Sequence, residues 1–391
     1  MLLSLTNEPR DYAWGSASLL ASLEGRAPTG APEAEVWFGD HPGDPADVVG
    51  GGTLDQVTGG SLPYLLKLLA AARPLSIQVH PTIAQARAGW ERELGLPADD
   101  PQRNYRDDNH KPELIVALSE RFESLSGLRP IDRTVALLGL LGSGEGVAQL
   151  RARLESAGDP LRDAIGWLLG GEAQREVDQI IEAVVAAAER DDAGEWSANL
   201  RAIADVAKTY PRDPGVVVAL LMNHVVLRRG DGLFLRAGLL HAYLSGLGVE
   251  IMAASDNVLR GGLTPKRIDV PELLAILDTS PGEVPVLRPA AGEVVTEYPV
   301  PVPDFALTRI TLDGDPVVIE VAGPTMVLAT AGSVVVTSAT GRSWRSRSGR
   351  RASRARTNPL SLSRVSARPS SRALGAERAL RVVSRHADDS P

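Results

Sequence analysis

The sequence predicts a mainly β protein that is interrupted by an α-helical insert. Short apolar runs broken by Gly and Pro fill residues 1–128, and similar runs return over 216–270. Between them, residues 129–215 carry apolar residues at helical spacing. Further short apolar runs with Gly turns cover 271–340 and predict a second β domain, which we expect to be incomplete. The expected order is therefore β barrel, helical insert, return to the barrel, second β domain, and an atypical tail over 341–391.

The first β region consists of short strands that are separated by turns. In "KPELIVALS", Glu113 and Ile115 lie on one face of the predicted strand, and Leu114 and Val116 lie on the other. Pro112 biases the residue before it toward extended backbone, as expected where a strand begins. The runs "EAEVWFGDHPGDP" and "LPYLLKLLAAARPLSIQVHP" predict further strands and one short helix.

The helical insert contains at least four segments with apolar residues at helical spacing. In "EAQREVDQIIEAVVAAAERDD" they recur at i, i+3, i+4, i+7 and i+8, namely Val177, Ile180, Ile181, Val184 and Val185. This stripe predicts an amphipathic helix with one buried face.

Strand character returns in "GVVVALLMNHVVLRRGDGLFLRAGLLHAYLSGLGVEIMAAS". Within this run, the turn Gly230-Asp231-Gly232 predicts a β-hairpin. After it, "PELLAILDT" predicts a short helix, and "PVVIEVAGPTMVLATAGSVVVTSATG" predicts the strands of a second small barrel or sandwich.

The composition excludes several kinds of site and location. The chain of 391 residues has no cysteine, so it contains no disulfide, no thiolate zinc finger and no cysteine nucleophile. Its first residues lack a basic segment followed by a long apolar core, and no apolar stretch reaches the roughly 18 residues of a membrane span. We therefore expect a cytoplasmic protein without a membrane partner.

The net charge of −8 is unevenly distributed. Residues 341–391 hold 13 Arg, no Lys and three acids, a balance of +10, which leaves −18 for the rest of the chain. An acidic body argues against nucleic acid as a partner. The Arg/Ser-rich segment begins abruptly at about Gly341 and resembles out-of-frame translation of a GC-rich gene. A solvated, disordered tail fits the same composition, and a basic arm for nucleic acid or membrane is the third alternative.

Gln78 and His80 lie at i and i+2 in the apolar run "PLSIQVHPT" and so share one face of a predicted strand. They form either a hydrogen-bonded polar pair or half of a metal site. Catalytic zinc commonly takes three His or carboxylate ligands and keeps one position open. Glu113 in "KPEL" and His241 in "GLLHAYL" would complete such a set, with Gln78 as a fourth ligand. Ligands of this kind also suit Mn, Co or Fe.

The other histidines have competing interpretations. His110 is close to Glu113 in sequence and competes with it as a ligand, although residues at i and i+3 do not share a strand face. His41 follows a Gly-Asp turn and is expected in a loop, His224 is expected as a core or strand histidine, and His386 lies in the Arg/Ser-rich segment.

Four motifs together resemble the type I mannose-6-phosphate isomerases, also called phosphomannose isomerases, over about residues 1–340: "YAWGS", "LSIQVHP", "NHKPELIVAL" and "AGLLHAYLSGLGVEIMAASDNVLRGGLTPK". The resemblance implies a cupin-type fold of β-barrel or jelly-roll domains with a helical domain. It implies one Zn²⁺ per chain, held by Gln78, His80, Glu113 and His241. It also implies interconversion of mannose 6-phosphate and fructose 6-phosphate, and we expect a monomer.

The resemblance assigns further residues to the site. Arg260, in "NVLRGGLTPK", matches the active-site arginine of the family, and Lys111 and Glu250 match polar groups that line the same pocket. The positions that match residues near the sugar phosphate are Ser76, Lys67 and Lys266.

An aldose–ketose isomerase moves a proton between C2 and C1 through an enediol, so it needs a base and positive charge near the developing anion. Arg260 would supply that charge. Glu250 is a candidate base, since a buried carboxylate has a raised pKa, and a salt bridge to Arg260 or Lys111 is the alternative. For Lys67 and Lys266, the alternative to phosphate binding is a solvated surface lysine.

Two other classes of function fit part of the pattern. A cupin oxygenase commonly uses a two-His, one-carboxylate iron site. A sugar-binding cupin without catalysis is the second alternative, and the presence of Arg260, Glu250 and all four ligand residues argues against it. Product analysis with mannose 6-phosphate, with and without oxygen, separates these functions.

Overall fold

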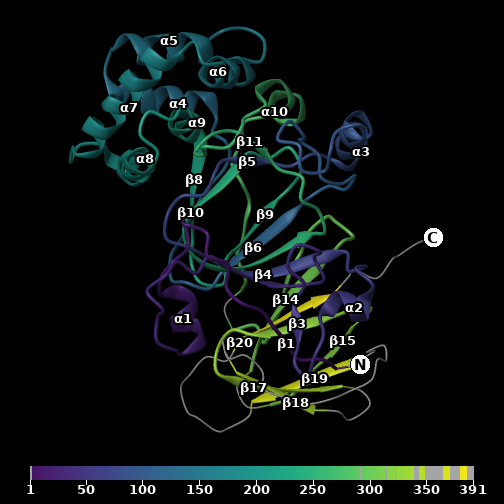
Figure 1. The fold of residues 1–391 in the computed structure, drawn as a ribbon. Coiled ribbons are helices and arrows are strands. Elements are labelled where there is room, and N and C mark those ends of the chain that lie inside the picture. The colour runs from purple at the N-terminus through teal and green to yellow at the C-terminus, as the bar shows by residue number, and fades with distance from the viewer. Residues whose placement is uncertain are drawn as a thin grey trace.

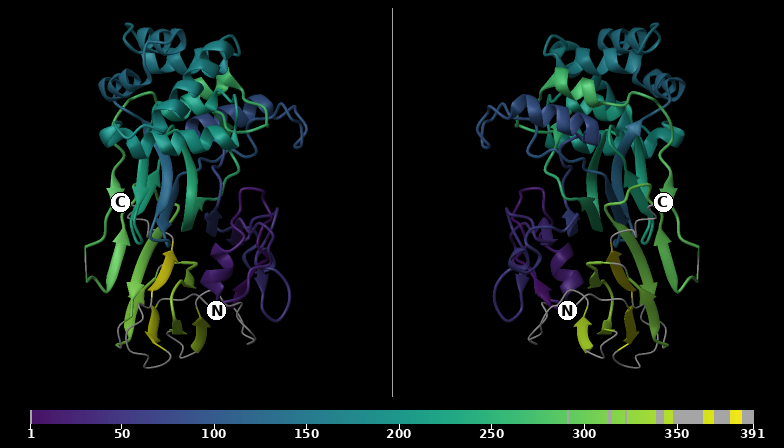
Figure 2. Two further views of the ribbon diagram at one scale, coloured as in Figure 1. Left: turned by 90° about the vertical axis from the view of Figure 1, so that its left-hand side faces the viewer. Right: turned by 90° about the vertical axis from the view of Figure 1, so that its right-hand side faces the viewer.

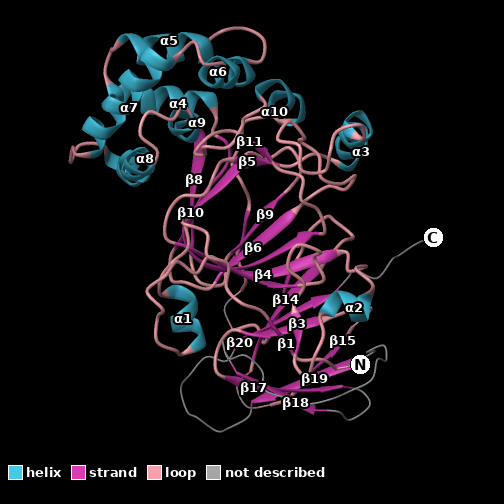
Figure 3. Ribbon diagram, viewed as in Figure 1, coloured by secondary structure: helices cyan, strands magenta, loops and turns pink. Residues whose placement is uncertain are grey.

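The computed structural model describes residues 2–290, 292–312, 315–321, 323–338, 343–347, 364–369 and 379–384. Figure 1 shows a group of helices at one end of the molecule, strands in the middle and the C-terminal strands at the opposite end. The side views in Figure 2 keep this order, so the molecule is elongated along one axis. The mainly β architecture with a helical insert agrees with the sequence-based expectation (Figure 3).

The middle of the molecule is a sheet of ten strands. Its strands are β2 (Glu35–Phe38), β4 (Tyr64–Ala71), β5 (Gln78–Val79), β6 (Glu113–Ala117), β7 (Phe122–Leu128), β8 (Met222–Leu227), β9 (Gly232–Leu235), β10 (His241–Ala253), β11 (Leu259–Arg260) and β12 (Val286–Leu287). The main path runs β11-β5-β10-β6-β9-β12, while β4 joins β10 to β2 and β7 joins β10 to β8. The long strand β10 is therefore common to both branches.

Strand β10 changes partners along its length. Its first residues pair with β5 and β7, and its later residues pair with β4 and β6. The register with β7 shifts between Tyr243 and Ser245, which marks a β-bulge. Gly246 follows with φ of +124°, and a Cβ there would lie 2.7 Å from the ring of Phe122. Only glycine fits this position, because both the backbone angle and the space exclude a side chain.

The strand register brings candidate site residues to one face of the sheet. Glu250 on β10 is the Cα partner of Lys67 on β4. Met252, two positions later on the same face of β10, is the partner of Glu113 on β6. Because cross-strand partners point to the same side, Lys67, Glu113 and Glu250 share that side.

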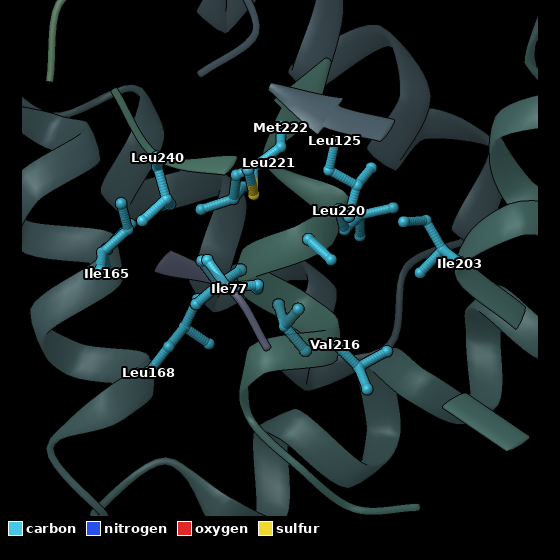
Figure 4. Close-up of a cluster of buried hydrophobic side chains, with 14 of the residues drawn as sticks. Ile77, Leu125, Ile165, Leu168, Ile203, Val216, Leu220, Leu221, Met222 and Leu240 are labelled. Atoms are coloured by element: carbon cyan, nitrogen blue, oxygen red, sulfur yellow. The ribbon is translucent and has the colours of Figure 1, made fainter. Parts of the chain in front are cut away.

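The helical insert follows β7 and ends before β8. It consists of α4 (Ile131–Leu138), η1 (Gly139–Leu141), α5 (Glu145–Leu154), α6 (Pro160–Leu169), α7 (Gln174–Ala188), η2 (Gly194–Trp196), α8 (Ser197–Thr209) and α9 (Gly215–Leu220). The stripe predicted for α7 is confirmed, since Val177, Ile180 and Val184 are buried. The core of the insert continues into the sheet, where Ile77 and Leu240 contribute to the same cluster (Figure 4).

The remaining elements near the barrel are short. They are β1 (Leu5–Thr6), α1 (Leu19–Glu24), β3 (Asp47–Val48), α2 (Leu54–Thr58), α3 (Ile83–Glu93) and α10 (Val270–Ile276). Helix α3 begins directly after the β5 segment with a capping box formed by Thr82 and Gln85. Helix α10, predicted as a short helix, contributes Leu273 and Ile276 to the core of the helical insert. It therefore packs against helix α6 and strand β11 rather than against the C-terminal strands.

The C-terminal strands form two sheets of four strands each. One follows the order β13 (Val295–Tyr298), β14 (Ala306–Thr311), β20 (Ala379–Ser384) and β16 (Met326–Ala329). The other follows the order β15 (Val317–Glu320), β19 (Arg364–Pro369), β17 (Ser333–Ser338) and β18 (Ser343–Arg347). A small apolar cluster that includes Ile310, Val334 and Val336 forms the core of this part.

The Arg/Ser-rich segment differs from the expected disordered tail in three places. Strand β20 pairs with β14 and β16, β19 pairs with β15 and β17, and β18 pairs with β17. Ladder hydrogen bonds join backbone groups, which almost every residue type carries, so an Arg- and Ser-rich segment can occupy a sheet position despite a weak apolar pattern. The rest of the stretch 341–391 lies outside the described residues.

Three sequence-based predictions for local structure were wrong. Residues 215–220 form helix α9 rather than a strand. All six are buried, so the apolar run lacks the periodicity that would distinguish a helix from a strand. The two runs 33–45 and 62–81, in which one short helix was expected, contain strands β2, β4 and β5 and no helix, and β4 is buried on both faces. The turn at Gly230 forms, but the strands it connects pair with different partners, β8 with β7 and β9 with β6, so they make no hairpin.

Among the described residues, no helix combines the length and the apolar character needed to cross a membrane.

Candidate active site

Three buried side chains gather in the middle of the sheet: His80, Glu113 and His241. One potential ligand atom from each lies within 4.8 Å of the others. His80 follows β5, while Glu113 opens β6 and His241 opens β10. Residues far apart in sequence therefore meet where three strands begin or end.

The hydrogen bonds of the two imidazoles fix their tautomers. His80 Nδ1 lies 2.7 Å from the Asn257 carbonyl oxygen, and His241 Nδ1 lies 3.0 Å from the Leu239 carbonyl oxygen. A carbonyl oxygen only accepts, so each Nδ1 carries the proton and each Nε2 keeps a free lone pair. This is the arrangement in which histidines bind metal ions in proteins.

Both Nε2 atoms face the carboxylate of Glu113. His80 Nε2 is 3.3 Å from Oε1, and His241 Nε2 is 3.4 Å from Oε2. His80 Nε2 is buried and has no hydrogen-bond partner among the described residues. A buried nitrogen lone pair without a donor, beside a second such nitrogen and a carboxylate, fits a divalent cation with mixed N/O ligands.

The electrostatics of His80 and Glu113 favour the protonation states that bind a cation. Burial, together with the Lys111 ammonium, lowers the pKa of His80 to about 4, so the ring is neutral at neutral pH. Burial alone would raise the pKa of Glu113, but Lys111 and the imidazoles outweigh it and hold that pKa well below its usual range. Lys111 is itself buried, and its Nζ contacts Glu113 Oε1.

A second polar cluster lies beside the first and is built around Lys67. Its Nζ is 3.4 Å from Glu250 Oε2 and 3.7 Å from Glu35 Oε1, and it lies 4.9 Å from the centre of the Trp37 ring. Lys67 is 7% exposed, which rules out the alternative of a solvated surface lysine. Burial would lower the pKa of Lys67, but the carboxylates of Glu35 and Glu250 outweigh it and raise that pKa above its ordinary value.

Glu250 has the opposite electrostatic character to Glu113. Burial and the negative charge of Glu113 raise the pKa of Glu250, despite the opposing effect of Lys67 and Lys111. Its Oε1 accepts a hydrogen bond of 2.9 Å from the Tyr243 hydroxyl. Two neighbouring carboxylates whose pKa values are driven apart are a feature of sites that perform proton transfer.

Gln78 and Ser76 lie next to the metal-site candidate. The backbone of Gln78 pairs with His241 on one side and with Arg260 on the other. Its Nε2 donates to Ser76 Oγ at 3.3 Å, so the amide oxygen, the atom that a metal would bind, takes no part in this bond. Gln78 is thus the cross-strand neighbour of His241, one of the three residues of the metal-site candidate.

Positive charge accumulates at the rim of the site. Arg260 is half-buried at the end of β11, and burial and the neighbouring Arg106 lower its pKa. Lys266 is exposed on the following loop, where Arg260 and partial burial lower its pKa. Arg106 acts on the pKa of Arg260, and Arg260 acts on that of Lys266, so the charges of these three cations influence one another.

The other three described histidines lie outside the three-residue cluster, and His386 falls outside the described residues. His110 pairs with Asp304 at 3.0 Å, so it does not replace Glu113. His41 pairs with Asp256 at 2.9 Å and is part of a loop, as expected. His224 is a strand residue that pairs with Glu123 at 2.8 Å, in agreement with its structural interpretation.

Sequence reasoning missed Glu35, Tyr243 and Asn257. Tyr243 follows His241 at i+2, the spacing of one strand face, and this signal was present in the sequence. Glu35 alternates with Trp37 in the same way on β2. Nothing in the local sequence of Asn257 shows that its carbonyl oxygen would meet His80.

Comparisons with known proteins decide the family. A family model described as "Phosphomannose isomerase type I, catalytic domain" matches residues 2–131. A mannose-6-phosphate isomerase of Escherichia coli (strain K12) is 35% identical over 331 residues, which cover 78% of this chain and 82% of that protein. The chain belongs to the type I phosphomannose isomerase family. A mannose-6-phosphate isomerase of Homo sapiens is 31% identical over 352 residues, covering 78% of this chain and 81% of that protein.

Solved structures of phosphomannose isomerases have the same fold as this chain. The mannose 6-phosphate isomerase of Salmonella typhimurium, bound to its substrate fructose 6-phosphate and to zinc, superposes with a TM-score of 0.82. It is 31% identical, and the match covers 98% of this chain and 99% of that one. A mutant of the phosphomannose isomerase of the same organism gives a TM-score of 0.83 at 29% identity, with the same coverage of both chains. The resemblance seen in the sequence and the expected cupin-type fold are confirmed.

Proposed function

We propose that this chain interconverts mannose 6-phosphate and fructose 6-phosphate with one Zn²⁺ held by Gln78, His80, Glu113 and His241. The observation that carries this proposal is the buried His80–Glu113–His241 cluster, with two imidazole Nε2 lone pairs directed at one carboxylate. Family membership supports the substrate, since the relatives are mannose-6-phosphate isomerases. Zinc is bound in a homologous crystal structure that also holds fructose 6-phosphate.

A bound zinc ion would polarise the sugar oxygens and position them as a Lewis acid. Glu250 is the proposed base that moves the proton between C1 and C2, because burial raises its pKa toward the range of a useful base. Tyr243 and Lys67 hold the two carboxylate oxygens of Glu250. These two contacts hold the carboxylate of Glu250 in one orientation.

Arg260 is proposed to stabilise the enediolate that develops during proton transfer, since its guanidinium stays charged at every relevant pH. Lys266, with Ser76, is proposed to bind the phosphate, supported by the accumulation of positive charge at this rim. Lys111 contacts the carboxylate of Glu113 and lines the same site. Lys67 lies against Glu250 and Glu35, so its contacts favour a role beside the base over phosphate binding.

A coupled assay tests this function. Fructose 6-phosphate formation from mannose 6-phosphate is followed before chelation, after chelation and after addition of Zn²⁺. We expect activity that chelation removes and zinc restores, with no dependence on oxygen. Activity that persists in the fully chelated enzyme would contradict the metal dependence, and oxygen-dependent turnover would indicate an oxygenase instead. The expectations of a monomer and of a cytoplasmic location remain predictions.

A further inference from the structure

We propose that Asn257 is a positioning residue that sets the tautomer of His80 and holds the segment leading to Glu113. Asn257 thereby prepares two ligands of the metal site before the ion binds. This inference rests on the metal site proposed above. Asn257 is fully buried, lies after β10 and contacts the cluster through His80.

The first part of this role belongs to the backbone of Asn257. Its carbonyl oxygen lies 2.7 Å from His80 Nδ1 and fixes the proton on that nitrogen. Any residue has a carbonyl oxygen, so this bond depends on how firmly residue 257 is held in place. The partner of a ligating histidine sets the orientation of its ring and its basicity.

The side chain of Asn257 supplies that fixation. Oδ1 accepts from the backbone N–H of Arg106 at 2.7 Å and of Asp107 at 3.4 Å. Nδ2 donates to the carbonyl oxygens of Asp107 at 2.9 Å and Asn109 at 2.8 Å, and to Asp107 Oδ1 at 3.1 Å. The side-chain amide of an asparagine offers two N–H donors and one oxygen acceptor, and Asn257 uses all of them.

Further bonds join the same two segments. Ser255 Oγ donates to Asp107 Oδ1 at 2.8 Å, and the backbone N–H of Asp256 donates to Asp107 Oδ2 at 2.7 Å. Asn109 Nδ2 donates to the carbonyl oxygen of Ala254 at 3.1 Å. The segment 106–109 leads within four residues to Glu113 at the start of β6. One buried amide therefore connects the chain that orients His80 with the chain that carries Glu113.

Asn257→Asp tests the proposal, because it keeps the size of the side chain and the backbone carbonyl. It removes both Nδ2 donors and brings a negative charge beside the carboxylate of Asp107. We expect a rise of roughly 10- to 100-fold in the dissociation constant for Zn²⁺, the range found for partners of ligating residues. We also expect a changed visible absorption spectrum of the Co²⁺ form, since that spectrum reports ligand geometry directly.

Asn199→Asp is the matched control. Asn199 is a buried asparagine on α8 of the helical insert, where the same chemical change costs stability away from the site. We expect a lower Tm for both variants, but wild-type zinc affinity and a wild-type Co²⁺ spectrum only for Asn199→Asp. If Asn257→Asp matches Asn199→Asp in affinity and spectrum, Asn257 has only a structural role and the proposal is overturned.

A measurement on the wild-type enzyme covers the case in which Asn257→Asp does not fold. Nitrogen-15 NMR of the histidine-labelled, metal-free form, with His80 assigned by a His80→Gln variant, reads the tautomer directly and without the constraint that a bound ion would impose. A proton on Nδ1 of His80 supports the proposal, and a proton on Nε2 overturns it. If the wild-type enzyme binds neither Zn²⁺ nor Co²⁺, the proposed metal site itself fails, and that outcome is distinct from a normal site that is indifferent to Asn257.

Discussion

The Tyr243 hydroxyl donates a hydrogen bond of 2.9 Å to Glu250 Oε1, although the two residues lie seven positions apart on one strand. An odd separation places side chains on opposite faces of a regular strand. The β-bulge between Tyr243 and Ser245 adds one residue and so returns Glu250 to the face of His241. The bulge is therefore what brings the proposed base and the metal-site candidate to the same side of β10.

The first prediction concerns this hydrogen bond. A hydrogen bond to an ionised carboxylate favours the charged form, so Tyr243→Phe should raise the pKa of Glu250 further. Bonds to charged groups are worth about 1.5–3 kcal/mol, so the effect is large enough to measure. We expect the acidic limb of the kcat/KM profile to move to higher pH. An unchanged limb, with a uniform loss of rate at every pH, would show that Glu250 is not the group that titrates.

The second prediction separates charge stabilisation from substrate binding at Arg260. Arg260→Ala should lower kcat by roughly 10²- to 10³-fold while zinc content stays normal. Arg267→Ala is the matched control, because Arg267 is an exposed arginine in the following loop that pairs with Asp269 at 2.6 Å. Steady-state kinetics and metal analysis of both variants test this. A normal kcat with only a raised KM would assign Arg260 to binding of the phosphate.

The third prediction distinguishes the two residues that compete in the sequence as ligands. Glu113→Gln should greatly weaken zinc binding, because it removes the only carboxylate in the three-residue cluster. His110→Asn should leave zinc binding unchanged, since His110 pairs with Asp304 instead. Titration of both apo variants with Zn²⁺ measures this. Loss of zinc affinity in His110→Asn alone would show that the ligand set is wrong.

The fourth prediction uses the pair formed by Glu123 and His224, which joins β7 to β8. The hydrogen bond from His224, with help from Arg121, lowers the pKa of Glu123 to about 2 from an ordinary value of 4.5. Because the pKa of Glu123 is lower in the folded state than in the unfolded chain, the ionised carboxylate stabilises the fold above pH 4.5. This stabilisation is lost as the pH falls toward 2. We expect Glu123→Gln to be less stable than the wild type at pH 6 and to approach it near pH 2. Urea unfolding across this range measures the difference, and a constant gap would exclude this linkage.

The fifth prediction concerns the Arg/Ser-rich segment. Strand β20 lies between β14 and β16, so its backbone amides should exchange slowly with solvent despite their sequence context. Hydrogen exchange with mass spectrometry on the intact chain tests this. Rapid exchange over 379–384 would support the disordered tail expected from the composition. Resequencing of the gene around codon 341 tests the hypothesis of out-of-frame translation.

Part of the fold could be predicted from the sequence because some helices and strands bury only one face. Helix α7 shows a clear stripe at Val177, Ile180 and Val184, since only one of its sides faces the core. Strand β4 and helix α9 are buried on all sides and therefore lack any period that distinguishes strand from helix. The same lack of period explains why a short helix was expected among the strands of the first β region and a strand at 215–220.

The metal-site candidate could be predicted from the sequence for a different reason. His80, Glu113 and His241 are residues whose chemistry restricts the sites they form, and the motifs around them are long enough to indicate the family. The contacts of Lys67 with Glu35 and of Tyr243 with Glu250 depend on strand register and on the bulge in β10. Register follows from packing across distant segments, which a local pattern does not contain.

The core of the helical insert includes Ile77 and Leu240, labelled in Figure 4, and also Val79. These three are the immediate sequence neighbours of Gln78, His80 and His241. The helices and the strands that carry the metal-site candidate are therefore parts of one cooperative unit, and the insert should not fold when excised. Ligand binding stabilises every element that unfolds together with the site. Zinc added to the apo protein should consequently slow proteolysis of α6 and α8, helices whose residues belong neither to the metal site nor to the proposed phosphate site.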